Sequence, residues 1–467
     1  MRIALLFIMF LVFSGSHGQN KQLLYNVDGL PQTLMSNPGA SLDFDGHVGL
    51  PLLSQFSFSA GSTGVSVHDI FEDSNTDINA RITRVMRRLT SRDYFTATQQ
   101  LEVVSLGWRL DKDHYLSAGI YQELDFFSYF PKDPAILVNE GNNNYINVPF
   151  DFSHISFTGD ALLVYHLGLN KVIDRQLTVG ARLKLYSGIF NAQSVNNTGM
   201  FITRDTPQGP NYYRHYAENV NIRVNTSGYT TAIDNNSTVE EATADILSRS
   251  FFGGNVGAGI DLGATYIIND NLIATGSVQD IGLMWQQKDV ENYLYYGSYR
   301  TDGLEPLFPD VAPGGNAIPY WDIFEEEVER NLIDETLNEN YITWRPFKIN
   351  SSLEYGFGRS YAPCTYLRKV NRRHTNLLGI HFFGMKRPRG LNYAFTTYYD
   401  RKFSSRLRMR LAYTIDDFSY TNIGLMVSTQ LNRFNFYLAA DNLIGYFNLA
   451  KTYSASVQIG MQFVFMR

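Results

Sequence analysis

In the stretch SRLRMRLAYTI, residues 405–415, large apolar side chains alternate from Leu407 onwards with smaller or basic ones. The apolar row is Leu407, Met409, Leu411, Tyr413 and Ile415, and the opposite row contains Arg406, Arg408 and Arg410. Successive side chains of a strand point to opposite faces, so one face is apolar and the other cationic. A soluble sandwich would bury the apolar row, whereas a membrane barrel would place it in lipid and turn the arginines into a wet lumen. This strand alone fits both folds.

The same alternation recurs along the chain, for example in residues 177–185, 256–268 and 423–431. A strand that crosses a membrane needs about 9–11 residues, whereas strands of soluble proteins peak near 5–6 residues. Long, one-sided strands in such number are uncommon in soluble proteins. The sequence therefore predicts an all-β fold, namely a closed antiparallel transmembrane β-barrel with a few short helices in its insertions.

Bacterial barrels have even strand numbers, and we expect about 14 strands here, with 12 and 16 as the alternatives. The expected strands are 46–50 with 53–67, then 97–110, 113–124, 155–169, 175–190, 254–268, 271–285, 347–358, 374–386, 391–403, 405–415, 421–431, 433–442 and 453–466. The last of them carries Phe463 and Phe465 on its apolar face. An aromatic-rich closing strand is typical of bacterial outer-membrane barrels.

The first residues, MRIALLFIMFLVFSGSHGQ, have the pattern of an export signal. Arg2 precedes an apolar run at 3–13 that is too short to span a bilayer, and Ser16 and Gly18 are the small residues of a cleavage site. We predict a signal peptide at 1–18 and export to the cell outer membrane, where lipid surrounds the protein. Cys364 is the only cysteine, which excludes an intramolecular disulfide and a zinc–thiolate site.

Three segments interrupt the strand pattern, namely residues 75–92, 191–252 and 287–345. Residues 75–92 repeat apolar side chains at helical spacing, and 323–340, IFEEEVERNLIDETLNEN, predict a short acidic helix. The predicted organisation is a signal peptide (1–18), an N-terminal hatch-like segment (19–45) and a barrel (46–467) with long insertions at 191–252 and 287–345. Long loops of barrels lie on the outer side and are the places where function most often resides.

The sequence contains no motif that indicates an enzyme, a metal or a cofactor. It has no HExxH, and no GxSxG or phosphate-loop signature in a strand–turn–helix context. The acidic run Glu325–Glu329 lacks the loop glycine of a calcium site, so a solvated helix face is favoured. The net charge of −6 without a basic block does not indicate nucleic acid as a partner. We expect a protein that is not an enzyme, with no catalytic residue, metal or cofactor.

The row Arg406, Arg408 and Arg410 has two interpretations. It could guide anions through the lumen, or it could be a structural ladder paired with luminal acids such as Glu354, Asp261 or Asp400. The ladder is favoured, because stacked like charges need partners.

Several blocks of the chain resemble a family of Bacteroidota outer-membrane barrels catalogued only as a domain of unknown function. They include YNVDGLPQTLMSNPGA, DFFSYFPKDPAILVNEGN, LTVGARLKLYSG, GIDLGATYIINDNL and YTNIGLMVSTQLNRFNFYLAADNLIGYFNLA, in the right order over nearly the whole mature chain. More distantly, the architecture is similar to the long-chain fatty-acid transporter superfamily. That resemblance implies fourteen strands and an N-terminal hatch inside the barrel, marked by Asn-Pro-Ala. The corresponding residues here are Asn37, Pro38 and Gly39, followed by Ala40, so the motif carries an inserted glycine.

The resemblance leaves two functional classes open. One is a passive channel for uptake of small hydrophobic molecules. The other is a structural or pore-blocking component of a type IX secretion translocon, with translocon proteins as partners. A luminal pocket lined by aromatic residues would favour the channel, and a lumen filled by charged pairs, with large periplasmic-side insertions, would favour the interaction protein. For residues 28–45, the alternative to a hatch is a loose leader.

Overall fold

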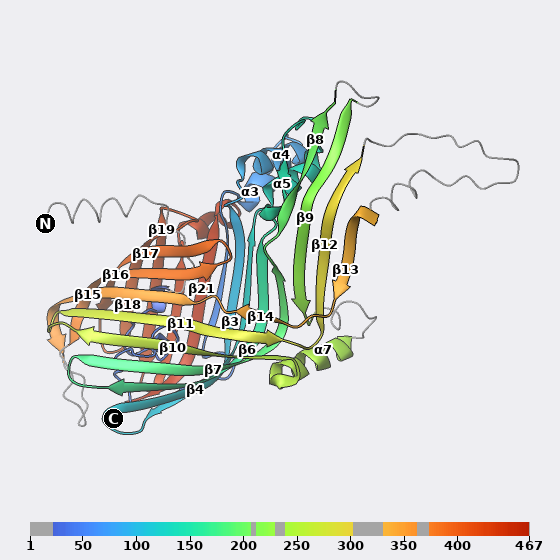
Figure 1. Ribbon diagram of the computed structural model, residues 1–467. Coiled ribbons are helices and arrows are strands. Elements are labelled where there is room, and N and C mark those ends of the chain that lie inside the picture. The colour runs from blue at the N-terminus through green and yellow to red at the C-terminus, as the bar shows by residue number, and fades with distance from the viewer. Residues whose placement is uncertain (1–21, 207–211, 229–238, 302–329, 362–372, 467) are drawn as a thin grey trace, which may run out of the picture.

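The computed structural model describes residues 22–206, 212–228, 239–301, 330–361 and 373–466, and its centre is a closed antiparallel barrel (Figure 1). The barrel strands are β1 (Gly46–Gly49), β2 (Phe56–Ser62), β3 (Tyr94–Arg109), β4 (His114–Tyr129), β6 (Phe157–Val172), β7 (Leu177–Ser194), β10 (Asn255–Ile267), β11 (Leu272–Gln286), β14 (Tyr341–Trp344), β15 (Lys348–Tyr361), β16 (Arg373–Arg387), β17 (Gly390–Lys402), β18 (Leu407–Ile415), β19 (Asn422–Leu431), β20 (Phe434–Asp441) and β21 (Ser454–Phe465). β14 lies in the predicted insertion 287–345, where no strand was expected, and the bounds of the other strands follow the expected ones closely.

Each barrel strand pairs with its neighbours in an antiparallel ladder, and the ring closes where β1 and β2 pair with both β3 and β21. β1 and β2 occupy one position of the ring, and β14 and β15, which both pair with β11, occupy another. The ring therefore has 14 positions, as expected from the sequence. Closure leaves no unpaired edge in the barrel wall, which is what a β-structure in lipid requires.

The alternation of β18 is visible in its burial. Leu407, Leu411 and Tyr413 are exposed on the outer face, whereas Arg408 and Arg410 are buried inside. Other strands likewise present large apolar residues outwards, for example Leu183 and Leu185 of β7. An apolar outside and a polar inside are the arrangement of a transmembrane barrel. Among the described residues, no helix is both long and apolar enough to cross a membrane.

The two ends of the barrel differ. Short turns at 110–113, 173–176, 268–271, 403–406 and 432–433 connect strands at the end where β21 finishes, which we call the short-turn end. Most of the inserted structure lies at the opposite, long-loop end. Its helices are α3 (Val67–Phe71), α4 (Ile78–Arg88), α5 (Lys132–Glu140), η2 (Phe152–His154), α7 (Val239–Ser248), η3 (Arg249–Gly253) and η4 (Gly445–Lys451). In outer-membrane barrels short turns face the periplasm and long loops face outwards.

A sheet projects beyond the long-loop end (Figure 1). Its strands are β5 (Phe150–Asp151), β8 (Thr198–Asp205), β9 (Tyr213–Ser227), β12 (Val290–Thr301) and β13 (Leu332–Leu337). β9 continues the barrel wall, because its last residues pair with the end of β7.

The two predicted insertions are therefore more ordered than the sequence suggested. Residues 191–252, expected to lack regular strands, contain the end of β7 together with β8, β9 and α7. The helix expected at 323–340 is wrong at 332–337, which form β13, and 323–329 lie outside the described residues. The reason is tertiary, because β13 pairs along β12 and its backbone hydrogen bonds are satisfied there. The helix expected in 75–92 is confirmed as α4, with Asp77 accepting from the backbone N–H groups of Asn79 and Ala80.

Candidate functional site

Residues 22–45, which we call the N-terminal segment, run through the interior of the barrel. They include the short helices η1 (Gln22–Leu24) and α2 (Thr33–Ser36). Polar side chains on five barrel strands form hydrogen bonds with this segment. They are Asn170 on β6, Arg182 on β7, Thr275 on β11, Arg410 on β18 and Gln462 on β21. Because these strands lie around the whole ring, the segment that they all contact lies inside it.

Apolar residues of the N-terminal segment are buried against the inner wall. Leu23, Leu24, Val27 and Leu30 form one cluster with wall residues Tyr398, Ala412, Met426, Tyr437 and Ala439. Phe44 packs edge-on against Tyr115, with ring centroids 5.6 Å apart. Burying several large apolar side chains, each contributing about 1.5–3 kcal/mol, holds the segment in place.

Four arginines hold the backbone of the N-terminal segment from different sides, and we call them the arginine clamps. Arg410 donates from Nη1 to the carbonyl oxygen of Tyr25 at 2.6 Å, and Arg408 donates to that of Asp28 at 2.8 Å. Arg182 donates to the carbonyl oxygens of Leu34 at 3.1 Å and Met35 at 2.8 Å, and Arg109 to that of Phe44 at 3.0 Å. A guanidinium has five N–H donors, so one side chain can bind both a carbonyl and an acid.

Each clamp also binds a carboxylate. Asp400 accepts from Arg408 Nε at 2.7 Å and from Arg410 Nε at 3.0 Å, and Asp261 accepts from Arg182 Nε at 2.7 Å. Asp45 accepts from Arg109 Nε at 3.1 Å. The ladder expected from the sequence is thus present for Arg408 and Arg410, with Asp400 as the acid between them.

Arg406 does not belong to the clamps, although alternation placed it in the same row. It is exposed and lies in the turn before β18, which begins at Leu407. The turn redirects the chain, so the period of the strand does not extend back to residue 406. Of the other two acids proposed as partners of this row, Glu354 accepts instead from the hydroxyl of Tyr398, and Asp261 accepts from Arg182.

The predicted motif Asn37, Pro38 and Gly39 lies against β7 and β10. Asn37 is completely buried, and its Oδ1 accepts from the backbone N–H of Gly39 at 3.0 Å. The carbonyl of Pro38 accepts from Asn170 Nδ2 at 2.8 Å. A Cβ atom on Gly39 would collide with the backbone of Gly263, and one on Gly180 would collide with the backbone of Pro38. Glycine on both sides is what allows this close approach.

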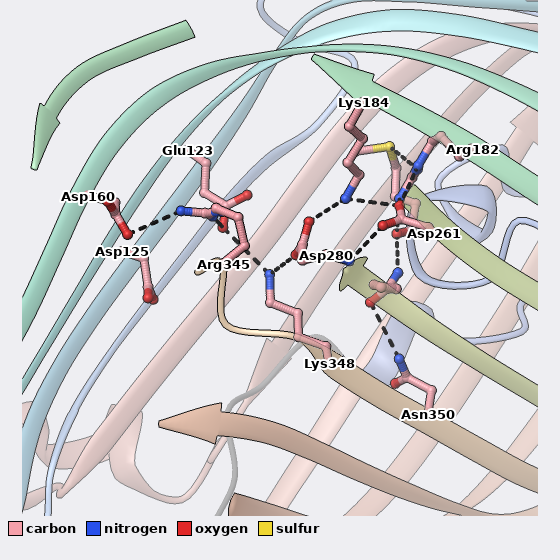
Figure 2. Close-up of polar contacts among 12 residues, drawn as sticks. Glu123, Asp125, Asp160, Arg182, Lys184, Asp261, Asp280, Arg345, Lys348 and Asn350 are labelled. Atoms are coloured by element: carbon pink, nitrogen blue, oxygen red, sulfur yellow. Dashed lines mark hydrogen bonds and ion pairs between the residues drawn. The ribbon is translucent and has the colours of Figure 1, made fainter. Parts of the chain in front are cut away.

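A network of buried charges crosses the lumen beside the N-terminal segment (Figure 2). Lys184 binds Asp261 at 2.9 Å and Asp280 at 2.5 Å, and Lys348 binds Asp280 at 2.7 Å. Arg345 extends the network by binding Glu123 at 3.0 Å and Asp160 at 3.1 Å. Opposite charges alternate through the network, which is how charges tolerate burial.

The alternation pattern of each strand, taken alone, does not predict most of this charge network. The inward alternation of β7 does identify Arg182 and Lys184, and that of β10 identifies Asp261. Regular alternation along β11 would turn Asp280 outwards. A β-bulge between β10 and β11 instead makes Gln279 and Asp280 both point inwards.

A cavity of about 70 Å³ lies between the N-terminal segment and the charge network. Its lining includes Leu24, Met35, Tyr121, Phe383 and Met385 on the apolar side, and Asp280 and Lys348 on the polar side. One water needs about 10–15 Å³ by this kind of measure, so the cavity has room for a few waters or a very small molecule. The described part of the lumen is mostly filled.

The fold and the site define a transmembrane β-barrel whose lumen is occupied by its own N-terminal segment and by paired charges. The chain belongs to the family of unknown function DUF5723, whose model matches residues 38–441. This agrees with the resemblance seen in the sequence.

Solved barrels are similar only at a distance. The toluene transporter TodX of Pseudomonas putida is 10% identical, with a TM-score of 0.38, over 96% of this chain and 98% of that one. A FadL homologue of Pseudomonas aeruginosa is 8% identical, with a TM-score of 0.42, over 97% of this chain and 99% of that one. Likeness at this level says nothing about cargo. No curated protein matches the sequence.

Proposed function

We propose that this chain is a non-enzymatic small-molecule channel of a bacterial outer membrane, with the N-terminal segment as a hatch that closes it. The observation that carries the proposal is the set of arginine clamps. They bind mainly backbone carbonyls of the N-terminal segment, together with the side chains of Met35 and Asp45. The segment is therefore attached to a complete barrel by polar contacts that its movement could break. The wall does not need the segment for its ladders, which close without it.

The cavity supports a small cargo with an apolar body. Met35, Phe383 and Met385 line the cavity with thioether and aromatic groups, which suit the small hydrophobic molecules of the channel class considered above. Asp280 and Lys348 on the same cavity favour a cargo that also carries a polar group. Movement of the N-terminal segment would enlarge the cavity along the barrel axis.

A second candidate is a non-conducting interaction protein, the class that includes the translocon component considered above. The specific observation in its favour is the charge network, since Lys184, Arg345 and Lys348 fill the described lumen with ion pairs that a pore does not need. The sheet built from β8, β9, β12 and β13 offers a surface for a partner. Its position at the long-loop end, however, does not match the periplasmic-side insertions expected for that class.

Conductance separates the two candidates. The purified barrel is inserted into planar bilayers, and the intact chain is compared with a variant lacking residues 28–45. A channel closed by a hatch conducts little when intact and gives larger single-channel steps after the deletion. Both proteins are checked for the change in gel mobility on heating that folded barrels show.

The matched control is Arg204→Gln, which alters a half-buried arginine of β8 that pairs with Glu218 outside the barrel. It should leave the conductance of the intact chain unchanged. If the deletion variant folds and its conductance equals that of the intact chain, the hatch is contradicted and the interaction protein becomes the better interpretation.

A further inference from the structure

An apolar surface lies outside the barrel, on the turn that joins α7 to β10. Phe251 and Phe252 of η3 are 66% and 41% exposed, and Ile246 and Leu247 at the end of α7 are exposed as well. We call these four residues the apolar foot. Large apolar side chains gathered in this way on a surface indicate a site that meets a membrane or a partner.

The apolar foot sits on the outer surface of the barrel wall. Ser187 of β7 points away from the lumen, because its neighbour Tyr186 packs inside with Tyr121 and Met284. Ser187 is nevertheless fully buried, since its hydroxyl donates to the carbonyl of Arg249 and accepts from the N–H of Phe252 at 2.8 Å. η3 therefore covers this outward residue from outside. Figure 1 shows α7 beside the ends of β6 and β7.

The foot lies near aromatic residues of the outer wall. Ser187 pairs with Val256, Val256 with Trp285, and Trp285 with Ile342, so these positions form one cross-strand row over neighbouring strands. Trp285 is exposed, and Trp344, two residues after Ile342, is 75% exposed. Exposed tryptophans on the outer wall of a barrel are typical of the boundary between lipid chains and headgroups.

The foot is held rigidly. Phe252 has a left-handed backbone, φ 64° and ψ 12°, which is strained for an aromatic residue. Its ring stacks on outward-facing Tyr165 with centroids 4.7 Å apart, and the Tyr165 hydroxyl donates to the carbonyl of Ser250. Backbone strain that the surrounding structure maintains is commonly found at functional positions.

The foot is also tied to the projecting sheet. Arg249 binds Asp245 of α7 at 2.5 Å and Asp289 at 2.8 Å, just before β12 begins. The backbone carbonyl of Asp289 accepts in turn from Gly228, at the end of β9. Ion pairs and a backbone hydrogen bond therefore connect the apolar foot to the end of β9 and the start of β12.

We propose that the apolar foot inserts into the outer leaflet of the membrane and fixes the projecting sheet relative to the bilayer. Lipid is the occupant because the foot is continuous with the lipid-facing wall. Directly along that wall lie Leu167, Leu183 and Leu185, all exposed on the outer face of β6 and β7.

Site-specific fluorescence tests this proposal in the full chain. Phe251→Cys is made in a Cys364→Ser background, labelled with an environment-sensitive dye and reconstituted into phosphatidylcholine vesicles with or without brominated lipid. Leu185→Cys, on the lipid face of β7, is the positive control, and Val138→Cys, on α5 and 88% exposed, is the negative control. We expect the dye at 251 to be quenched to the same extent as the dye at 185.

Quenching at 251 as weak as at 138, with strong quenching at 185, would overturn the proposal. The proposal would also fail if the dye were shielded from brominated lipid but showed energy transfer between copies that rises with the protein-to-lipid ratio, since a second copy would then cover the foot. If Phe251→Cys fails to fold, Ile246→Cys reports on the same surface.

Discussion

Arg410 and Asp400 face each other across β18 and β17, with Arg410 Nε 3.0 Å from Asp400 Oδ2 and both side chains almost completely buried. The same guanidinium donates to the carbonyl oxygens of Leu23 and Tyr25. One side chain thus connects the barrel wall, a buried acid and the N-terminal segment.

Replacing Arg410 tests this connection. We expect Arg410→Met to lower the free energy of unfolding by about 3–5 kcal/mol, because breaking a buried ion pair leaves a charge without its full complement of partners. Urea unfolding in vesicles, followed by tryptophan fluorescence, measures the change. Arg401→Met, on the exposed face of β17, should change it by much less. Equal effects would mean that burial of the pair has no energetic importance.

Gly39 is expected to set the distance between the N-terminal segment and the wall. Gly39→Leu should displace the segment from β7 and β10, because any Cβ there meets the backbone of Gly263. Limited proteolysis should then cut residues 28–45 faster than in the intact chain. Gly276→Ala is the control, since a Cβ at that position would make only an ordinary contact 3.9 Å from the carbonyl oxygen of Asn350. Unchanged proteolysis of Gly39→Leu would show that the close approach is dispensable.

The lipid face is tested at Leu411. Leu411→Arg should destabilise the barrel by about 2–4 kcal/mol if the residue lies near the middle of the bilayer, because the outer face of β18 meets lipid chains. Arg406→Leu, in the exposed turn before β18, should have little effect. Heat-modified gel mobility and urea midpoints measure both variants. Equal losses for the two would contradict the assignment of faces.

The signal peptide remains a prediction from the sequence, because residues 1–21 lie outside the described part of the chain. Mass spectrometry of the protein from membranes should find Gln19 as the first residue. A mature chain that still contains Arg2 would contradict the prediction.

The helices at the long-loop end should respond to acid. The hydrogen bond from Arg87 on α4 lowers the pKa of Glu140 at the end of α5. A carboxyl whose pKa is lower in the folded state stabilises the fold above its unfolded pKa, and this contribution is lost as the pH falls through the folded value. Exchange rates of the α5 amides, divided by their intrinsic rates at each pH, should therefore rise as the pH falls below the ordinary pKa of a glutamate, about 4.3. Glu140→Gln should remove that acid-dependent step, and an unaltered pH profile in the variant would contradict the assignment.

Local patterning in the sequence was enough to place nearly every barrel strand, because alternation between lipid and lumen is a property of consecutive residues. It also placed α4 and the inward direction of Arg408 and Arg410. It misplaced Arg406, because a turn ends the alternation, and it assigned β13 to a helix, because pairing with β12 overrides local preference. An unbroken alternation along β11 does not place Asp280 inside, because the bulge shifts the period of this strand by one residue.

The occupied lumen is a product of tertiary structure. Arg182 meets Leu34 and Arg410 meets Tyr25 only once the ring has closed around the N-terminal segment. These partners are far apart in the chain, and nothing in either stretch specifies the other. Burial then makes each contact matter, since a guanidinium removed from water needs both its carboxylate and the carbonyls of the segment to satisfy its donors.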